Sequence, residues 1–317
     1  MGDLRKKYYG VNEHMTKICP ICDKESEVEL LGPYRNRHEL FGDKRLFICK
    51  ECSFIFVNPM PTADELDWYY KNVWLKDEVI VESSREAELT YQLQANERVE
   101  YISRHIDLMG KNIKILDVGS GYGYLIDAFK RSSRPDMSFY ATDPNHENVL
   151  RLKAKGARAF ADVGEIGEYN FDLITICFVL EHIGEPLKFM GSIMKYIKKG
   201  GHLFVDVPER DDTFKDILEP HVGVYTLKSL KTMADKLGLK TVHIIGHGVI
   251  RNKIIDKSYL RHNILERIIG AGIRYLDHIN MGDRISNLYK RHMLYKQFQF
   301  DKEGIDRWWI RVILQKP

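Results

Sequence analysis

Short apolar runs alternate with amphipathic segments from about residue 113 to the end of the chain. The runs IKILDV, SFYATD, FDLITICF and HLFVDVP are six to eight residues long and rich in β-branched and aromatic residues, as is typical of buried strands. Between them, segments such as YGYLIDAFKR and TLKSLKTMADKLG repeat apolar residues at helical spacing. Strands that alternate with helices indicate an α/β fold with a mostly parallel sheet between helix layers.

Two of the helices carry predicted boundaries. The segment EPLKFMGSIMKYIKKGG, residues 185–201, is predicted to be a helix that ends at its glycines. The segment PNHENVLRLKAKG is predicted to be a helix with Pro144 in its first turn.

The segment before the alternating region is predicted to be largely helical. Thr62 and Glu65 fit a capping box at the start of a short helix. The aromatic residues of this helix, from Trp68 to Tyr70, are expected to pack in a core, and the alternative is that they fold over a ligand. Residues 84–106 show apolar residues at helical spacing.

Four of the five cysteines form two pairs, CPIC and CKEC. Each pair can present both sulfurs to one ion, so Cys19, Cys22, Cys49 and Cys52 together suit a structural zinc ion. The 26 residues between the pairs have room for two or three short strands of a zinc ribbon. Disulfides and a redox pair are the alternatives, the first disfavoured in a reducing compartment.

Composition and charge narrow the class of protein. The chain has 317 residues, 44% of them hydrophobic, and a formal net charge of +3, which gives no general attraction to nucleic acid. There is no run of 18 apolar residues and no secretory or myristoylation pattern at the start. We therefore expect a cytoplasmic protein. The expected division is a flexible tail at 1–16, a zinc-binding ribbon at 17–60, a helical linker or lid at 61–110 and the α/β domain at 111–317.

A glycine-rich stretch, LDVGSGYG, follows the first strand of the α/β region. Ligands of such sheets bind at the carboxyl ends of the strands, and bare backbone there lets a ligand lie against the main chain. Tyr124 stands where a dinucleotide fingerprint has its third glycine, and the stretch lacks the lysine of a phosphate loop. Asp117 disfavours a phosphate and suits a cationic ligand, while Asp143, at the end of the next strand, can accept the hydroxyls of a ribose.

The order LDVGSGYG, ATDPN, FDLITICFVLEHI and KKGGHLFVDVP resembles a class I S-adenosylmethionine-dependent methyltransferase. The resemblance covers about residues 95–245 and the final strand. It implies a seven-stranded sheet whose last strand is antiparallel. It also implies a set of cofactor contacts, in which Asp162 meets the adenine amino group or only caps a helix, the two readings being about equal. The implied contacts are Asp117, Gly119, Ser120, Gly121, Gly123, Asp143, Pro144, Asp162, Cys177 and Phe178.

Candidate catalytic residues follow two of the strands. Glu181 and His182, in LEHI, are expected at the rim of the cofactor site. His221, in EPHVGVYT, is expected on a loop over the mouth, and Tyr225 is a weaker candidate. Either histidine could act as a base for a hydroxyl or amine acceptor, although an EH pair at this point often only shapes the pocket.

The cysteine pairs together with FIFVNPMPT and EPH also resemble a narrower group, the bacterial sugar methyltransferases with an amino-terminal zinc domain. In that group a histidine matching His221 is implicated as the base. The group carries a further carboxyl-terminal domain for which this chain has no room. Transfer to a sugar carbon is therefore in doubt, and transfer to oxygen or nitrogen is as well supported.

Residues 251–297 hold ten Lys or Arg and four Asp or Glu, which gives this segment a formal net charge of +6, whereas the rest of the chain has a net charge of −3. They are predicted to form a basic helical insertion before the last strand. The basic face is either simply solvated or attracts an anionic substrate such as a sugar nucleotide. A peripheral membrane contact is a less supported alternative.

Three functions compete at this point. The first is methyl transfer to a small molecule, in particular a sugar or phosphorylated carbohydrate of surface-glycan or natural-product synthesis. The second is an RNA methyltransferase whose ribbon grips nucleic acid, but residues 1–60 are not strongly basic. The third is a zinc-stapled binding module with an inactive pocket. The sequence does not predict an oligomeric state.

Overall fold

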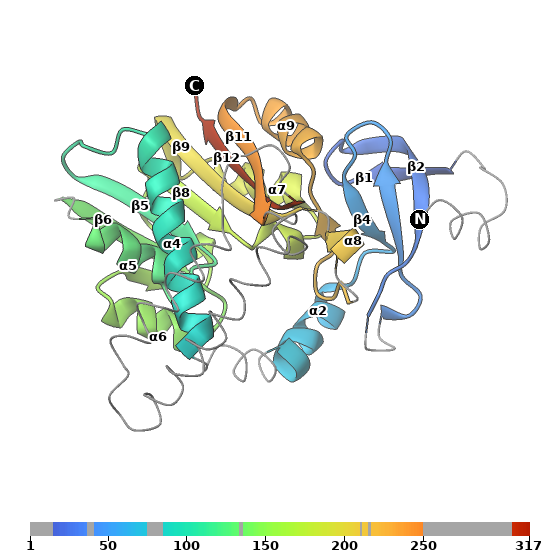
Figure 1. Ribbon diagram of the computed structural model, residues 1–317, viewed down its shortest axis with the longest axis horizontal. Helices are drawn as coiled ribbons and strands as arrows, with labels where there is room; N and C mark the ends of the chain where they lie inside the picture. The colour runs from blue at the N-terminus through green and yellow to red at the C-terminus, as the bar shows by residue number, and fades with distance from the viewer. Residues whose placement is uncertain are drawn as a thin grey trace, which may run out of the picture.

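Two β-sheets lie side by side in the chain, a large one with helices on both faces and a smaller one near the N-terminus (Figure 1). The computed structural model describes residues 15–36, 41–74, 85–132, 136–209, 211–214, 217–249 and 306–317. The predicted tail and the basic insertion lie outside these residues, apart from the start of the first strand at Met15.

The larger sheet confirms the predicted α/β architecture. Its strand order is β11-β12-β9-β8-β5-β6-β7, and the only antiparallel pairings in this order are those of β12 with β9 and β11. The order reverses between β5 and β8, which places a crevice at the carboxyl ends of these two central strands. The bounds are β5 Ile113–Val118, β6 Met137–Thr142, β7 Arg158–Phe160, β8 Phe171–Cys177, β9 Ile197–Pro208, β11 Lys240–Val249 and β12 Asp306–Gln315.

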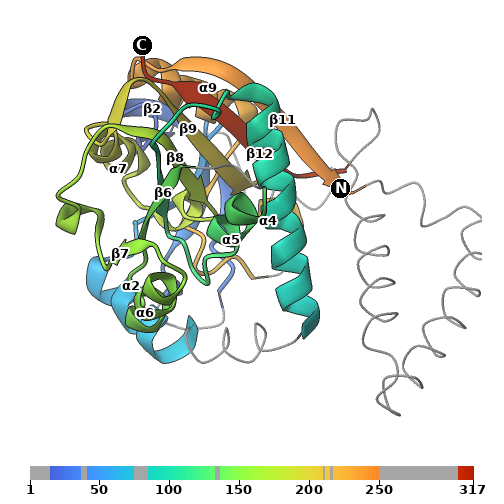
Figure 2. The same cartoon turned by 90° about the vertical axis from the view of Figure 1, so that its left-hand side faces the viewer.

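Helices cover both faces of this sheet (Figure 2). One face packs against α4 (Arg85–His105), α5 (Tyr124–Arg131) and α6 (His146–Ala154), through a core that includes Ile102, Phe129 and Phe204. The other face packs against α7 (Pro186–Ile193) and α9 (Leu227–Lys236). Because α4 contributes to the core of the large sheet, this part of the predicted linker is structurally part of the α/β domain.

The prediction of a helix over residues 185–201 was wrong in its second half. Helix α7 ends at Ile193, and residues from Ile197 onward form the start of β9. The Phe171 amide donates to the Tyr196 carbonyl at 2.9 Å. The Lys316 amide donates to the Gly201 carbonyl at 3.0 Å, and the Gly200 amide donates to the Lys316 carbonyl at 2.8 Å. Pairing with two neighbouring strands satisfies more buried backbone groups than one further helical turn would, so tertiary context overrides the local helical pattern.

The start of α6 also differs from the prediction. Asn145 is the N-cap, and its side chain accepts a hydrogen bond from the Glu147 amide at 2.8 Å. Pro144 therefore lies one residue before the cap, where it is exposed.

The smaller sheet has the strand order β1-β2-β3-β4-β10. Four of its strands come from the N-terminal segment: β1 Met15–Cys19, β2 Lys24–Pro33, β3 Arg45–Cys49 and β4 Ile55–Asn58. Two strands thus lie between the cysteine pairs, which confirms the predicted room for them. The fifth strand, β10 (Gly223–Val224), comes from the α/β part and pairs with β4. We refer to residues 15–58 as the four-cysteine domain.

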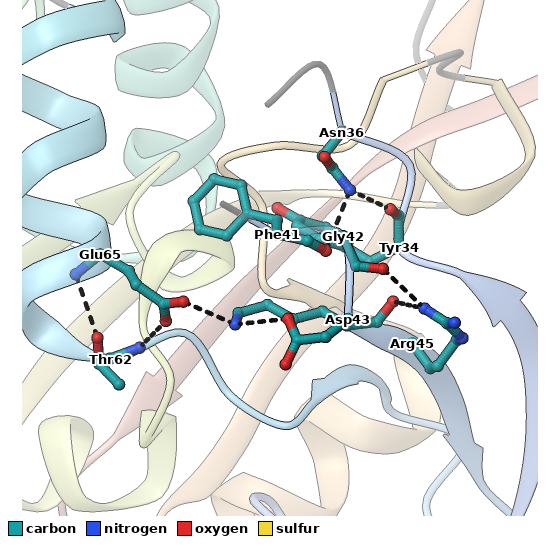
Figure 3. Close-up of polar contacts among 9 residues, drawn as sticks. Tyr34, Asn36, Phe41, Gly42, Asp43, Arg45, Thr62 and Glu65 are labelled. Carbon is teal, nitrogen blue, oxygen red and sulfur yellow. Dashed lines mark hydrogen bonds and ion pairs between the residues drawn. The ribbon is translucent and has the colours of Figure 1, made fainter. Parts of the chain in front are cut away.

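The short helix after this domain begins as predicted. Glu65 accepts from the Thr62 amide at 2.7 Å, and Thr62 accepts from the Glu65 amide at 3.2 Å, which completes a capping box for α2 (Ala63–Tyr69) (Figure 3). Glu65 also pairs with the buried Lys44 at 2.9 Å, so the cap fastens α2 to the four-cysteine domain. Of the aromatic residues expected in a core, Tyr69 is buried, whereas Trp68 is exposed.

Within the described residues, every helix is too short or too polar to span a membrane.

Candidate functional site

The glycine-rich loop joins β5 to α5 at the carboxyl end of the central strand. Gly119, Gly121 and Gly123 have φ angles of 69°, 53° and 74°, a region that side chains rarely adopt. The Gly119 and Ser120 amides both donate to the Thr142 carbonyl at 2.9 Å. A Cβ at Gly119 would overlap the Val179 side chain, so the loop needs glycine for both conformation and space.

Asp117 lies beneath this loop and is buried. It accepts hydrogen bonds from the Ser120 hydroxyl and, at 2.6 Å, from the Thr175 hydroxyl. Burial raises the pKa of Asp117 above its usual range, although the two hydroxyls and the Arg98 charge oppose this. A cationic ligand nearby would favour the ionised form.

Asp143 lies at the end of β6, beside the glycine loop, and is also buried. Its Oδ2 accepts from the Gly121 amide at 2.8 Å, and its Oδ1 accepts from the Asn145 amide at 2.9 Å. Asn148 donates to the same Oδ1 at 3.1 Å. The carboxylate therefore holds the loop and the start of α6 together, at the place where the sequence predicts the ribose hydroxyls.

The remaining predicted cofactor residues have distinct settings. Asp162 is exposed and caps a short 3₁₀ helix, accepting from the Gly164 amide at 2.6 Å. Phe178 follows β8 with φ 56°, and the Arg98 guanidinium lies over its ring at 4.6 Å. Burial raises the pKa of the Cys177 thiol, so this sulfur stays protonated and is a poor nucleophile.

The structure brings Glu181, His182 and His221 together, although some forty residues separate the first two from the third. Each offers a ligand or proton-accepting atom, and these atoms lie within 4.8 Å of one another. The His182 and His221 rings meet edge to face, with centroids 4.8 Å apart. His221 Nδ1 lies 2.5 Å from a carboxylate oxygen of Asp211, in α8 (Asp211–Phe214). The arrangement is able to accept a proton or to bind a cation.

Tyr225 is placed differently from these three residues. It is fully buried, and its hydroxyl donates to the Leu180 carbonyl at 3.1 Å. Burial, with a further contribution from the Glu181 charge, raises the pKa of Tyr225 well above its usual range. In this setting Tyr225 supports the Glu181 segment rather than facing an acceptor.

Sequence reasoning missed Asp211, the partner of His221. It lies in RDDTF, where two adjacent acids look like an ordinary polar loop. A spacing of ten residues, as between Asp211 and His221, matches no helical or strand repeat that would bring two side chains into contact, so only the folded chain shows the pair.

Sequence reasoning also missed a buried ionic network at the edge of the site. Asp206 Oδ2 accepts from Arg98 Nε at 2.7 Å and from Arg311 Nε at 3.2 Å. Although burial opposes ionisation, the charges of Arg311 and Arg98 hold the pKa of Asp206 well below its usual range. These groups line a pocket next to Phe178. Its lining residues are Gln94, Glu97, Arg98, Phe178, Asp206, His247, Trp309 and Arg311.

Replacing Asp206 by alanine is expected to lower the free energy of unfolding by about 3–5 kcal/mol, because two arginines would be left buried without their carboxylate. Denaturant unfolding followed by circular dichroism measures this. The control is Glu185→Ala, which removes an exposed pair with Lys188 and should change stability little. Equal stability of the two variants would contradict the prediction.

Glu97 provides a pH-dependent contribution to stability. Burial raises the pKa of Glu97 to about 7, although Arg311 and Arg98 oppose this. The folded protein holds the proton of the Glu97 carboxyl more tightly than the unfolded chain does. The stability that this proton contributes is therefore fully present below about pH 4.3 and is lost as the pH rises through about 7.

Glutamine does not titrate, so we expect the wild type to lose stability relative to Glu97→Gln as the pH is raised from about 5 to 8. Melting temperatures of both proteins across this range test it. Parallel curves would show that Glu97 does not titrate as described.

The comparisons with known proteins agree with this geometry. Residues 89–244 match the model of a family described as a methyltransferase domain. The match covers just under half of the chain, and this part of it is similar to methyltransferase domains.

The chain is also similar to proteins named ubiquinone biosynthesis O-methyltransferase. The one from Coxiella burnetii is 32% identical over 132 residues, 40% of this chain and 55% of the relative. The one from Pseudomonas fluorescens is 29% identical over 200 residues, 53% of this chain and 84% of the relative. The chain thus spans about half the length of the first relatives it matches.

Among solved structures, a SAM-dependent methyltransferase from Archaeoglobus fulgidus has a TM-score of 0.48 at 13% identity, and the alignment covers 77% of this chain and 100% of that one. A plantazolicin methyltransferase solved with S-adenosylhomocysteine has a TM-score of 0.48 at 12% identity, covering 79% and 93%.

The four predicted metal-ligating cysteines form one buried cluster in the four-cysteine domain. Cys19 Sγ lies 3.6 Å from Cys52 Sγ, and Cys22 Sγ lies 3.8 Å from Cys49 Sγ. Neither distance is that of a disulfide. Four sulfurs about 2.3 Å from a tetrahedral zinc would be about 3.8 Å apart, so the cluster has the dimensions of a zinc site. The Cys22 amide also points at Cys19 Sγ, at 3.4 Å.

Proposed function

We propose that this protein transfers a methyl group from S-adenosylmethionine to an oxygen or nitrogen of a small-molecule acceptor. The observation that carries the proposal is the meeting of two predicted sets of residues at one edge of the sheet. The glycine loop with Asp143 ends β5 and β6, and the Glu181, His182 and His221 group follows β8 and β9.

S-adenosylmethionine supplies a methyl group already activated on a sulfonium, so the chain has to align the acceptor and exclude water. Asp143 would accept the ribose hydroxyls, and the bare loop at Gly119 and Gly121 would let the methionine portion lie against main chain. Asp117 would balance the sulfonium or the ammonium charge. Phe178 would flank the sulfonium.

His221 is the proposed base for the acceptor proton. Asp211 orients its ring through Nδ1, which leaves Nε2 as the atom able to take a proton. Asp211 would also stabilise the resulting imidazolium, as a carboxylate does in catalytic triads. His182, whose ring packs edge-on against that of His221, would help to place the acceptor.

A polar acceptor fits the surroundings best. The pocket beside Phe178 is lined by Arg98 and Arg311, but also by Glu97 and by the Asp206 carboxylate that pairs with both arginines. The resemblance to zinc-containing sugar methyltransferases favours a sugar or phosphorylated carbohydrate, and the names of the relatives favour transfer to oxygen. We also propose that the four-cysteine cluster holds a structural zinc ion.

The proposal is tested by release of S-adenosylhomocysteine in the presence of separate acceptors: a nucleotide-linked sugar, a catechol, a small amine and bulk tRNA. Turnover with one of the small molecules is expected, and turnover with tRNA alone would replace the proposal by the RNA alternative. His221→Ala should lower kcat about 100-fold on the acceptor found, while the exposed His146→Ala should not. Full activity of His221→Ala would rule out His221 as the base.

A further inference from the structure

The Glu181, His182 and His221 group has the composition and spacing of a metal site as well as of a catalytic base. We propose that it binds one divalent cation, separate from the ion of the four-cysteine cluster. The inference rests on the proposed function, because it assigns this cation to the acceptor end of the same site.

The first support is geometric. One atom from each of the three residues lies within 4.8 Å of the other two. Ligands about 2.1 Å from a common ion are separated by about 3.0 to 4.2 Å, so small side-chain rotations would close the set around one ion. Two imidazoles with one carboxylate leave coordination positions open for water or for an acceptor.

The second support is the carboxylate behind His221. Histidines that bind metals usually donate their other ring N–H to a carboxylate or a carbonyl, which fixes the tautomer and the ring plane. Asp211 lies 2.5 Å from His221 Nδ1, and this contact would present Nε2 to the ion. Both the histidine and the aspartate are buried, so the orientation is held.

The third support is local charge. Glu181 is only 1% exposed, and the described part of the segment from 209 to 221 buries three more carboxylates, on Glu209, Asp211 and Glu219. Ionised carboxylates are costly to bury without compensating positive charge. A divalent cation next to Glu181 would add positive charge beside this buried group of carboxylates.

The two proposed metal sites would differ in ligand chemistry. Four sulfurs suit zinc, whereas two imidazoles and one carboxylate also accept manganese, iron or cobalt. Manganese therefore reports on the Glu181, His182 and His221 group with little interference from the cysteines.

The cation would change the role of His221 from base to ligand for hydroxyl acceptors. A hydroxyl bound at an open position is more acidic, so its proton leaves to water. The oxygen electron pair then forms the bond to the methyl carbon, and the electron pair of the carbon–sulfur bond stays on sulfur in S-adenosylhomocysteine. The acceptor class of this proposal is thus a hydroxyl compound, ideally with a second oxygen nearby.

The experiment uses the full-length protein with its cysteine site loaded with zinc. Mn²⁺ is titrated and free ion is measured by electron paramagnetic resonance, without any acceptor. We expect the wild type to bind about one Mn²⁺, His182→Ala and Glu181→Gln to bind at least about 10-fold more weakly, and Asp211→Asn to bind about 10-fold more weakly. His146→Ala, an exposed histidine on α6, is the matched control and should bind as the wild type does.

Zinc content and calorimetric binding of S-adenosylhomocysteine show which variants are folded, and a variant that fails both is replaced by the next in the series. The inference is overturned if the wild type binds no Mn²⁺ up to about 1 mM, a concentration that covers even weak sites, or if folded variants bind it unchanged. Failure of the proposed function is a separate result, because it would appear as no binding of S-adenosylhomocysteine and no turnover.

Discussion

Asp143→Ala is expected to weaken the binding of S-adenosylhomocysteine roughly 1,000-fold. Two charge-assisted hydrogen bonds to the ribose hydroxyls would be lost, at about 1.5–3 kcal/mol each, and about 4 kcal/mol corresponds to three orders of magnitude. The loop would also lose its anchor, because the same carboxylate accepts from the Gly121 amide at 2.8 Å.

Calorimetric titration of the free protein measures this affinity without any knowledge of the acceptor. Asp143→Asn keeps one acceptor oxygen, so its affinity for S-adenosylhomocysteine should lie between that of the wild type and that of Asp143→Ala. The control is Asp235→Ala, an exposed carboxylate on α9, which should bind normally. A change of less than about 3-fold in Asp143→Ala would remove the basis for the proposed cofactor site.

Loss of the zinc ion proposed for the cysteine cluster is expected to abolish turnover while binding of S-adenosylhomocysteine survives. Structural zinc contributes about 10–16 kcal/mol to the folding of small zinc domains, so Cys49→Ser should release the ion and unfold the four-cysteine domain. Cys49 is fully buried within the cluster.

The effect should reach the acceptor end of the site because the four-cysteine domain holds the loop that carries His221. The Val57 amide donates to the Val222 carbonyl at 3.1 Å, and the Val222 amide donates to the Glu181 carbonyl at 2.8 Å. The Phe54 ring lies 4.9 Å from that of Tyr225. The cofactor loop, by contrast, is bonded to β6.

Zinc content, turnover and S-adenosylhomocysteine affinity are measured together on Cys49→Ser. Cys177→Ala, which removes the one cysteine outside the cluster, should keep its zinc. Retention of zinc and activity by Cys49→Ser would show that the cluster is not a structural metal site.

The positions of the cofactor loop and of the strands could be read from local patterns. The glycines of LDVGSGYG and the acid of ATDPN follow apolar strands, and the carboxyl ends of neighbouring parallel strands meet at one edge of a sheet. The capping box of Thr62 and Glu65 and the two cysteine pairs depend on spacings of three residues, so the chain's own geometry defines them.

The boundary of α7 shows where local pattern was insufficient. Residues 194–199 continue the helical pattern of the preceding segment, yet the backbone of β8 requires partners at Tyr196 and Ile197. Which segment supplies those partners depends on strand order, which the composition of a single segment does not contain.

The sequence by itself determined the α/β class, the glycine loop with its downstream carboxylate, and the four cysteines, because each depends on residues close along the chain or on strand ends that any parallel sheet aligns. Only the tertiary structure decided that Asp211 meets His221, that two arginines enclose Asp206, and that β10 completes the sheet of the four-cysteine domain. These contacts join segments from 10 to more than 150 residues apart. They are decided by packing and by the pairing of buried charges, and the pattern of apolar and polar residues along the chain does not predict them.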